Sequence, residues 1–304
     1  MRIFVIGGTG QIGMQLVPIL LKQGYDVVVG ARTNKVSGNS LLEGASYIAC
    51  NSWDKECLKE IAKNEQFDVI IDFPGTAWNV WEIFKDKVLH IVGCGSFWMY
   101  GRPHTVPTPE VAQEPCVFDF YAKRYQHILD AITESKEHKA EFTAIMPTNI
   151  CGPGKIPLDT SGGRDIEVHK SNMRGEMVYL PEGPEVLLAP CDCYDLAMLF
   201  ALAVNQREKA AGQIFNAGTA YALTATQFVQ TMGDIYGVNI PISYVSWKDY
   251  TETYNTEMGA WWHFYAHMYP DITKARTLLG YEPKYTPEQT LHRAGEWMRL
   301  EGLL

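Results

Sequence analysis

Four glycines near the beginning of the chain have the spacing of a loop that binds phosphate groups. Gly7, Gly8, Gly10 and Gly13 stand in the stretch GGTGQIG, between a short apolar run and a helix-like segment. Gly7 would allow a sharp turn after a strand, Gly10 would let the backbone approach a pyrophosphate, and Gly13 would let helix and strand pack closely. The phosphates would then lie at the N-terminus of the helix, where free N–H groups and the helix dipole favour anions.

The order of strand, loop and helix decides between two interpretations of this loop. A plain structural turn also collects glycine, so the glycines alone are weak evidence. Their position directly after an apolar strand and before a helix favours a dinucleotide-binding unit. The loop residues expected to contact the cofactor are Gly7, Thr9, Gly10, Gln11, Ile12 and Gly13.

A second stretch bears on which dinucleotide would bind. A site selective for NAD places an Asp or Glu near the end of the next strand, where it bonds the ribose hydroxyls, whereas an Arg suits a 2′-phosphate. The strand expected at 26–29 is followed by no acidic residue at 30–35, and Arg32 stands there instead. The sequence therefore favours NADP over NAD. The alternative is that Arg32 is a solvated loop residue.

Strands alternate with helices along the first half of the chain. Apolar runs predict strands at 3–6, 26–29, 45–50, 67–73, 88–92 and 142–146, and helices at 14–22, 54–63 and 120–136. This order predicts an α/β fold, a Rossmann-type doubly wound parallel sheet of about seven strands with right-handed crossovers. Pro74 and Gly75 follow the fourth strand, which places them beside the cofactor cleft.

The chain is expected to form two domains. Residues 1–150 would be an NAD(P)-binding Rossmann domain, to which strands near Leu187 and Ile214 return. Residues 151–304 would mainly form a smaller C-terminal α/β substrate domain. Cofactor and substrate would meet in the cleft between the two domains.

Composition limits the classes of partner. A formal charge of -9 argues against nonspecific binding to nucleic acid or to anionic membranes. No signal peptide is recognised, and no apolar run approaches the roughly 18 residues of a membrane span. A cytoplasmic location is therefore expected.

The cysteines predict neither disulfides nor a metal site. Seven cysteines are scattered along the 304 residues, which favours reduced thiols in the core. The only close pair, Cys191 and Cys193, lacks companions at the spacing of metal ligands.

Several further stretches carry a family resemblance. They are GCGSFWMYG at 93–101, PTNICGPG at 147–154, CYDLA at 193–197, GQIFNAG at 212–218 and DITKARTLLGYEP at 271–283. Together with GGTGQIG, they make the chain resemble an extended short-chain dehydrogenase/reductase of the NAD-dependent epimerase/dehydratase type over nearly its full length. The resemblance implies NAD(P) as cofactor, with Pro147 among its contacts, and a small-molecule substrate.

The resemblance also implies a catalytic set of Ser or Thr, Tyr and Lys near the nicotinamide. In this pattern the Ser bonds the reacting oxygen, the Tyr is the general acid/base, and a Lys four residues later lowers the pKa of the Tyr and binds the ribose. A spacing of four puts Tyr and Lys on one helix face. Ser96 stands four residues before Tyr100 of a Tyr-Gly pair, as the family's Ser does. A serine in a glycine turn is the alternative.

The Tyr-Lys pair of the family is missing. Four residues after Tyr121 stands Tyr125, and four before Lys123 stands Asp119. Lys123 is a candidate for the ribose, or else a surface lysine, and Tyr121 is a candidate acid/base, or else an aromatic packed in the cleft. Asp119, with an ordinary pKa near 4, would be a poor proton donor at neutral pH unless desolvation raised that pKa.

The substrate side departs from the family as well. Members that act on nucleotide sugars typically clamp the diphosphate with arginines, but Leu188 falls near one such position and no arginine occurs between Arg207 and Arg276. A nucleotide sugar is therefore less favoured. An aromatic cluster stands there instead and suits a pocket, a homodimer contact or core packing: Tyr244, Trp247, Tyr250, Tyr254, Trp261, Trp262, His263, Phe264, Tyr265 and Tyr269. His169 and His263 are alternative proton carriers, or else structural histidines.

Three functions remain open. The first is an NAD(P)-dependent oxidoreductase or epimerase acting on a small carbonyl or sugar-like substrate through Ser96 and the incomplete Ser-Tyr-Lys set. The second is a non-catalytic NAD(P)-binding regulatory protein. The third is an RNA-associated role like that of the chloroplast stem-loop-binding relatives, which also depart from the Tyr-Lys pattern. The acidic charge argues against this third function.

Overall fold

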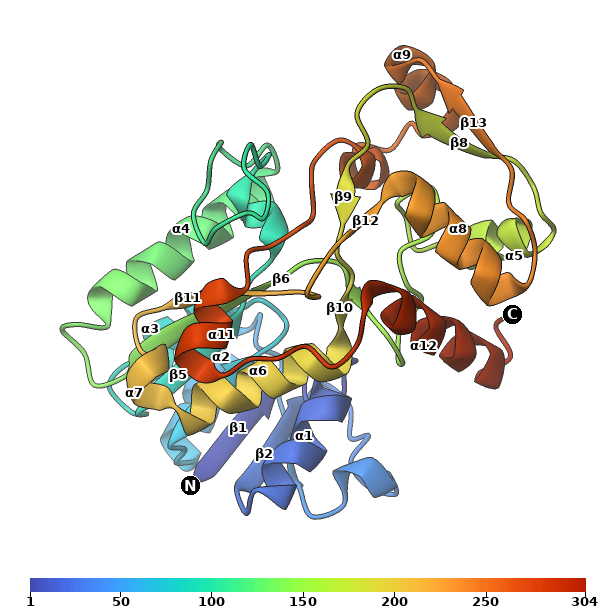
Figure 1. The fold of residues 1–304 in the computed structure, drawn as a ribbon. Helices are drawn as coiled ribbons and strands as arrows, with labels where there is room; N and C mark the ends of the chain where they lie inside the picture. Colours follow the sequence, from blue (N-terminus) through green and yellow to red (C-terminus); the bar gives the residue numbers. More distant parts are fainter.

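A seven-stranded sheet forms the centre of the larger of two lobes (Figure 1) in the computed structural model, which describes residues 1–304. The strand order is β11-β6-β5-β4-β1-β2-β3, and every neighbouring pair is parallel. The strands are β1 (Arg2–Ile6), β2 (Asp26–Ala31), β3 (Ser46–Ala49), β4 (Val69–Asp72), β5 (His90–Cys94), β6 (Glu141–Pro147) and β11 (Ile214–Ala217). The Rossmann-type doubly wound sheet expected from the sequence is confirmed.

Alternate residues of the central strands pack into two hydrophobic cores on opposite faces of the sheet. In β1, Phe4 and Ile6 belong to one core, and Ile3 and Val5 belong to the other. A sheet covered on both faces needs apolar residues at consecutive positions, which explains why its strands read as continuous apolar runs.

Helices cover both faces of the sheet. One face is covered by α2 (Lys55–Asn64), α3 (Ala77–Phe84) and α4 (Asp119–Glu134). The other is covered by α1 (Gly13–Lys22), α6 (Cys193–Asn205) and α11 (Thr273–Leu279), with α7 (Arg207–Ala210) at the end of α6. Helices α6 and α11 come from the second half of the chain, so the larger lobe extends well beyond residue 150.

Of the two strands expected to return to the central sheet, only the one near residue 214 does so. β11 pairs with β6, with Ile214 opposite Ala144. The expectation for Leu187 is wrong, because β9 (Leu187–Leu188) pairs with β12 (Leu223–Thr224) in the smaller lobe. The position beside β6 is already taken by β11, and the backbone of β9 is bonded to the segment around Met268 instead.

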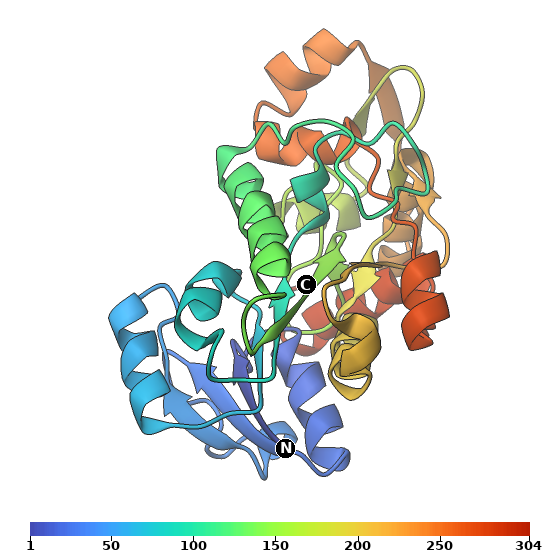
Figure 2. The same cartoon turned by 90° about the vertical axis from the view of Figure 1, so that its left-hand side faces the viewer.

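The smaller lobe is built from short elements around two longer helices (Figure 2). α8 (Ala225–Tyr236) and α12 (Pro287–Leu300) each begin with a capping box, formed by Thr224 with Gln227 and by Thr286 with Gln289. The other elements are α5 (Ile166–Met173), β8 (Val178–Pro181), β13 (Ile242–Val245), α9 (Trp247–Asp249), η3 (Tyr250–Tyr254), α10 (Met258–Trp261) and η4 (Trp262–Phe264).

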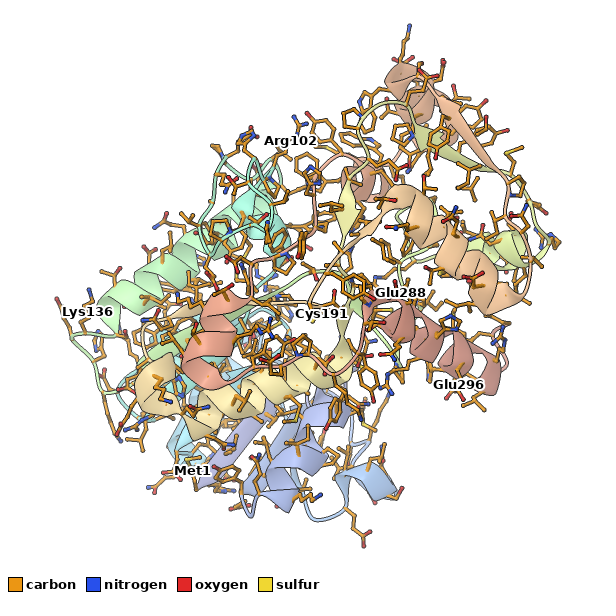
Figure 3. All side chains as sticks on the ribbon, viewed as in Figure 1. Met1, Arg102, Lys136, Cys191, Glu288 and Glu296 are labelled. Carbon is orange, nitrogen blue, oxygen red and sulfur yellow. The ribbon has the colours of Figure 1, made fainter.

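A small two-stranded pairing joins the lobes. β7 (Ile150–Cys151) lies parallel to β10 (Cys191–Asp192), and Figure 3 places Cys191 between the two lobes. All seven cysteines are free thiols. No helix combines the length and the apolar character that crossing a membrane requires.

Candidate active site

The glycine loop takes the form that the spacing of its glycines demands. Gly7 has a φ of +80°, a conformation that disfavours any side chain, and its N–H donates to the Gly30 carbonyl at 2.8 Å. A Cβ at Gly13 would collide with the backbone of Gly8. The close approach at Gly13 is therefore made within the loop itself, and helix α1 begins directly against it.

The beginning of α1 leaves donors free for a ligand. Ile12, the N-cap residue, contributes no side-chain hydrogen bond, and the main-chain N–H groups of Gln11 and Ile12 donate to no acceptor in the protein. Unpaired N–H groups at a helix N-terminus form a site for anions. The residues present thus fit the pyrophosphate of a dinucleotide.

The other residues expected at the cofactor lie along the same edge of the sheet. Arg32 is exposed just after β2, Pro74 and Gly75 follow β4, and Pro147 ends β6. The carboxyl ends of parallel strands meet at one edge, and ligands bind there in sheets of this kind. Gln11 extends the edge to the second lobe, since its side chain donates to the Gly152 carbonyl at 3.0 Å.

A cavity of about 410 Å³ lies beside this edge and draws residues from both lobes. Ser96 and Tyr121, two of the candidate catalytic residues, both line it, as does Gln11 of the glycine loop. The remaining lining residues are Trp98, Thr148, Asn149, Ile150, Lys155, Leu158, Gly162, Gly163, Arg164, Glu257, Gly259, Ala260 and His263. Ser96 is held at the N-cap of the short helix η2 (Phe97–Tyr100), where its hydroxyl accepts from the Trp98 N–H at 3.3 Å.

The four residues of α4 that were considered for the missing Tyr-Lys pair, which are Asp119, Tyr121, Lys123 and Tyr125, face different surroundings. Tyr121 lines the cavity, whereas Asp119 and Lys123 are exposed and do not. Tyr125 turns into the core, where its ring packs edge-on against Tyr100 at 5.7 Å and its hydroxyl accepts from the Ala112 N–H. Residues four apart share a helix face, so Asp119 and Lys123 stay together on the solvent side.

Two polar side chains on the wall of the cavity lack partners. Asn149 and His263 are each 8 % exposed, and neither the Asn149 Nδ2 nor the His263 Nδ1 has a hydrogen-bond partner. Arg164, by contrast, donates to the carbonyls of Ile156 at 2.7 Å and Ile150 at 2.9 Å. Buried polar groups are normally paired, so unpaired ones on a cavity wall indicate the place of a polar ligand.

The other candidate histidine is structural. His169 is fully buried in α5, with its Nδ1 2.6 Å from the Tyr236 hydroxyl and its Nε2 3.3 Å from the Pro157 carbonyl. Both ring nitrogens are therefore paired, and the residue does not line the cavity. Of the two histidines, only His263 lines the cavity.

Comparisons with known proteins agree with this geometry. Residues 3–82 match the model of the NAD dependent epimerase/dehydratase family. The matched part contains the glycine loop and strands β2 to β4. The dTDP-6-deoxy-L-talose 4-dehydrogenase (NAD(P)(+)) of Kitasatospora kifunensis is 24% identical, with 96% of this chain and 93% of that protein aligned. The UDP-glucose 4-epimerase of Lactobacillus helveticus is 22% identical, with 98% and 97% aligned.

A solved structure shows how far along the chain the likeness of folds extends. The UDP-glucose 4-epimerase of Thermotoga maritima, determined with UDP-glucose, superposes with a TM-score of 0.77 at 21% identity, covering 99% of both chains. Both lobes of the present chain thus share the fold of that epimerase. At this level of identity the comparison supports the fold and leaves the chemistry to the residues of the site.

Arg124 lies at the edge of the sheet where the cofactor is expected, although the sequence did not predict a contact there for this residue. The guanidinium of Arg124 lies against the backbone of Gly75, where a Cβ would collide with it, and it donates to the Cys94 carbonyl at 3.4 Å. Beneath it Asp72 is fully buried and accepts from the N–H of Thr76 at 2.7 Å and from its hydroxyl. Burial raises the pKa of Asp72 to about 6, and the hydrogen bonds from Thr76 and the charge of Arg124 oppose that rise.

The residues that sequence reasoning missed share a cause. Arg124 stands next to Lys123 in the sequence. Its contact with the Cys94 carbonyl depends on how α4 packs against the ends of β4 and β5. Asn149 was noticed only as part of a family-like stretch, and nothing in that stretch shows that its amide has no partner. His263 is a candidate proton carrier from the sequence, but only the tertiary structure brings it into the cavity that Ser96 lines.

Proposed function

We propose that this chain is an NAD(P)-dependent oxidoreductase or epimerase whose sugar-like substrate binds in the cavity beside Ser96 and Tyr121. One observation carries the proposal: Ser96, Tyr121 and Gln11 of the glycine loop line the same cavity. A dinucleotide on the loop would supply hydride chemistry next to the substrate. Ser96 would hydrogen-bond the reacting oxygen, and Tyr121 would give or take its proton.

Nucleotide sugars are the first substrate class to test. The two curated relatives are named for a dTDP-linked and a UDP-linked sugar, and the solved epimerase contains UDP-glucose. Lys155 and Arg164 bring positive charge to the cavity, although the arginines usual in such members are absent from their expected positions. We therefore expect weaker binding of the diphosphate than in those relatives.

NADP is proposed in preference to NAD. Arg32 is exposed at the end of β2, forms no ion pair, and has no acidic neighbour between residues 30 and 35. A free guanidinium at this point suits a 2′-phosphate. Titration of NADPH and of NADH against tryptophan fluorescence tests the preference, which equal affinities would contradict. If neither nucleotide binds, the whole proposal fails.

Turnover is tested with the Ser96→Ala variant. Each nucleotide is combined in turn with UDP-glucose, dTDP-glucose, simple ketones and aldehydes. Turnover is followed by nicotinamide absorbance and by analysis of the product sugars. Because Ser96 is the polar group aimed at the reacting oxygen, we expect turnover by Ser96→Ala to fall about 100-fold or more, with nucleotide affinity unchanged. Unchanged turnover would remove Ser96 from the mechanism.

A second function, a non-catalytic NAD(P)-binding protein, is favoured by one observation. Lys123 lies exposed outside the cavity, so it does not join Tyr121 there in the way the family pattern requires. The turnover measurements with UDP-glucose, dTDP-glucose, ketones and aldehydes distinguish the two functions. Nucleotide binding without turnover of any compound would favour the regulatory protein.

A further inference from the structure

Lys155 and Arg164 place two positive charges on the wall of the cavity that Ser96 and Tyr121 also line. Both residues belong to the segment that connects β7 to α5. Neither forms an ion pair, and the Lys155 ammonium has no hydrogen-bond partner in the protein. In a chain with a formal charge of -9, two cations of one cavity are thus left without a bound carboxylate.

Arg164 holds in place the segment that carries Lys155. Its guanidinium donates to the carbonyl of Ile150 at 2.9 Å and to that of Ile156 at 2.7 Å, and so bridges the chain on either side of Lys155. A guanidinium has five N–H donors, and the remaining ones donate to no acceptor in the protein. The arginine is therefore fixed in position and still has donors for a ligand.

Two carboxylates lie in this region, and neither is bonded to the cations. Asp159 is fully buried, and its side chain accepts from the main-chain N–H groups of Ser161 at 2.8 Å and of Asp165 at 2.9 Å. Its charge favours that of Arg164 only through space. Glu257 is the one acidic residue that lines the cavity, and it forms no ion pair.

The electrostatics of this wall disfavour the empty cavity. Partial burial and the like charge of Arg164 both lower the pKa of Lys155, and burial lowers the pKa of Arg164. Both effects mean that the positive charges are less stable here than in water. An anion bound in the cavity would stabilise them, and groups held under such electrostatic strain in a cleft are typical of functional sites.

We infer that Lys155 and Arg164 bind a phosphoryl group of the substrate in this cavity. The guanidinium supplies donors in a planar arrangement and the ammonium supplies a mobile point charge, and both suit phosphate oxygens. The inference rests on the proposed function, because it assigns a contact to the same substrate. It places recognition of the substrate's charge on the segment after β7, in a chain that has Leu188 near a position where an arginine is usual.

Three substitutions test the assignment of Lys155. Lys155→Met removes the charge and keeps a long side chain, and Lys155→Arg keeps the charge. Lys136→Met is the matched control, because Lys136 is exposed just after α4 and does not line the cavity. Calorimetric titration of the NADPH-loaded proteins with UDP-glucose, glucose 1-phosphate and glucose gives the affinities. The first two probes distinguish a nucleotide diphosphate from a sugar monophosphate as the source of the phosphoryl group.

We expect Lys155→Met to bind the tighter of the two phosphorylated probes about tenfold more weakly than the unaltered protein does, because a charge-assisted hydrogen bond is lost. Lys155→Arg should stay within about threefold of the unaltered protein, and Lys136→Met should match it. Glucose should bind more weakly than either phosphorylated probe. Melting temperatures and NADPH affinities should stay level in all variants.

Equal affinities of Lys155→Met and the unaltered protein for the phosphorylated probes would overturn the inference. So would failure of the unaltered protein to bind either of them. A loss of NADPH affinity in Lys155→Met, with the affinities for the probes unchanged, would assign the lysine to a phosphate of the cofactor and also overturn it. NADPH binding together with turnover of an uncharged carbonyl compound would show that the proposed function holds even where this inference fails.

Discussion

At the scale of single residues, Tyr121 is the side chain on which the proposed chemistry depends. It shares its cavity with Ser96, while Tyr125, four residues later on the same helix, lies in the core. The two tyrosines form a matched pair, because removing either hydroxyl changes one oxygen atom only. They differ in whether that oxygen can reach a substrate.

We expect Tyr121→Phe to lower turnover about 100-fold or more, since general acid/base catalysis contributes on that order. Tyr125→Phe should leave turnover unchanged and cost about 1 kcal/mol of stability, because the Ala112 N–H loses its acceptor. Steady-state kinetics and urea unfolding on both variants give the comparison. Equal losses of turnover would mean that Tyr121 acts through packing.

The buried histidines make stability depend on pH. Burial lowers the pKa of His263 from 6.5 to about 4, so between these values the unfolded chain takes up a proton that the folded chain excludes. The contribution of His263 to the free energy of unfolding is therefore fully present above pH 6.5 and is lost as the pH falls toward 4. His90, with a pKa lowered to about 3, acts in the same direction, while Asp72, with a raised pKa, opposes both.

Unfolding free energies measured from pH 7 to pH 4 test this dependence. We expect the unaltered protein to lose stability on acidification and His263→Gln to lose less of it, by an amount on the order of 3 kcal/mol. The exposed His292→Phe control should follow the unaltered protein. If the unfolding free energies of His263→Gln and of the unaltered protein fell by the same amount between pH 7 and pH 4, burial of this imidazole would not be what couples folding to pH.

At the scale of elements, the join between β1 and α1 needs glycine for a steric reason. A methyl group at Gly13 would meet the backbone of Gly8, so the loop and the helix would have to separate. We expect Gly13→Ala to destabilise the protein by about 1–3 kcal/mol and to abolish NADPH binding, because the free N–H groups of Gln11 and Ile12 would move.

Gly259 in α10 provides the control, because a Cβ there meets nothing within 4 Å. Gly259→Ala should leave both the melting temperature and NADPH affinity unchanged. Normal NADPH affinity in Gly13→Ala would place the phosphates elsewhere in the molecule.

The elements differ in how far the sequence reveals them. The central strands are recognisable because burial on both faces demands apolar runs such as 3–6 and 88–92. β9 is only two residues long, and its pairing with β12 follows from tertiary structure. The apolar character of α6 predicts a buried helix but does not say in which lobe, so its place beside α1 could not be foreseen.

The site, like the fold, can be predicted from the sequence only where short local patterns determine it. The glycine spacing and the position of Ser96 are patterns within short stretches, and sequence reasoning can find them. The choice among Asp119, Tyr121, Lys123 and Tyr125 depends on how α4 is rotated against the cleft. The place of His263 in the cavity wall depends on tertiary contacts such as the one between its ring and Trp98, which no local pattern records.

At the scale of the whole molecule, the first 150 residues do not make an independent domain. The larger lobe takes β11, α6 and α11 from the second half of the chain, and Phe200, Phe215 and Leu279 of these elements belong to its core. Without them β6 would become an exposed edge, and the apolar face of the sheet beside α1 would be open to water.

We therefore expect a 1–150 fragment to be aggregation-prone and to lack cooperative unfolding, although it contains the entire glycine loop. Size-exclusion chromatography and thermal unfolding followed by circular dichroism test this against the full chain. A soluble fragment with a cooperative transition and NADPH affinity would show that the returning elements are dispensable.

The repeated passage of the chain between the lobes also bears on how this protein can change over evolutionary time. Because β10, β12 and the segment around Met268 all lie on paths that connect the two lobes, a new substrate lobe could not be acquired by a single recombination event. Such an event would sever the returning helices from their sheet. We therefore expect specificity in this architecture to diversify by substitutions within the inherited lobes.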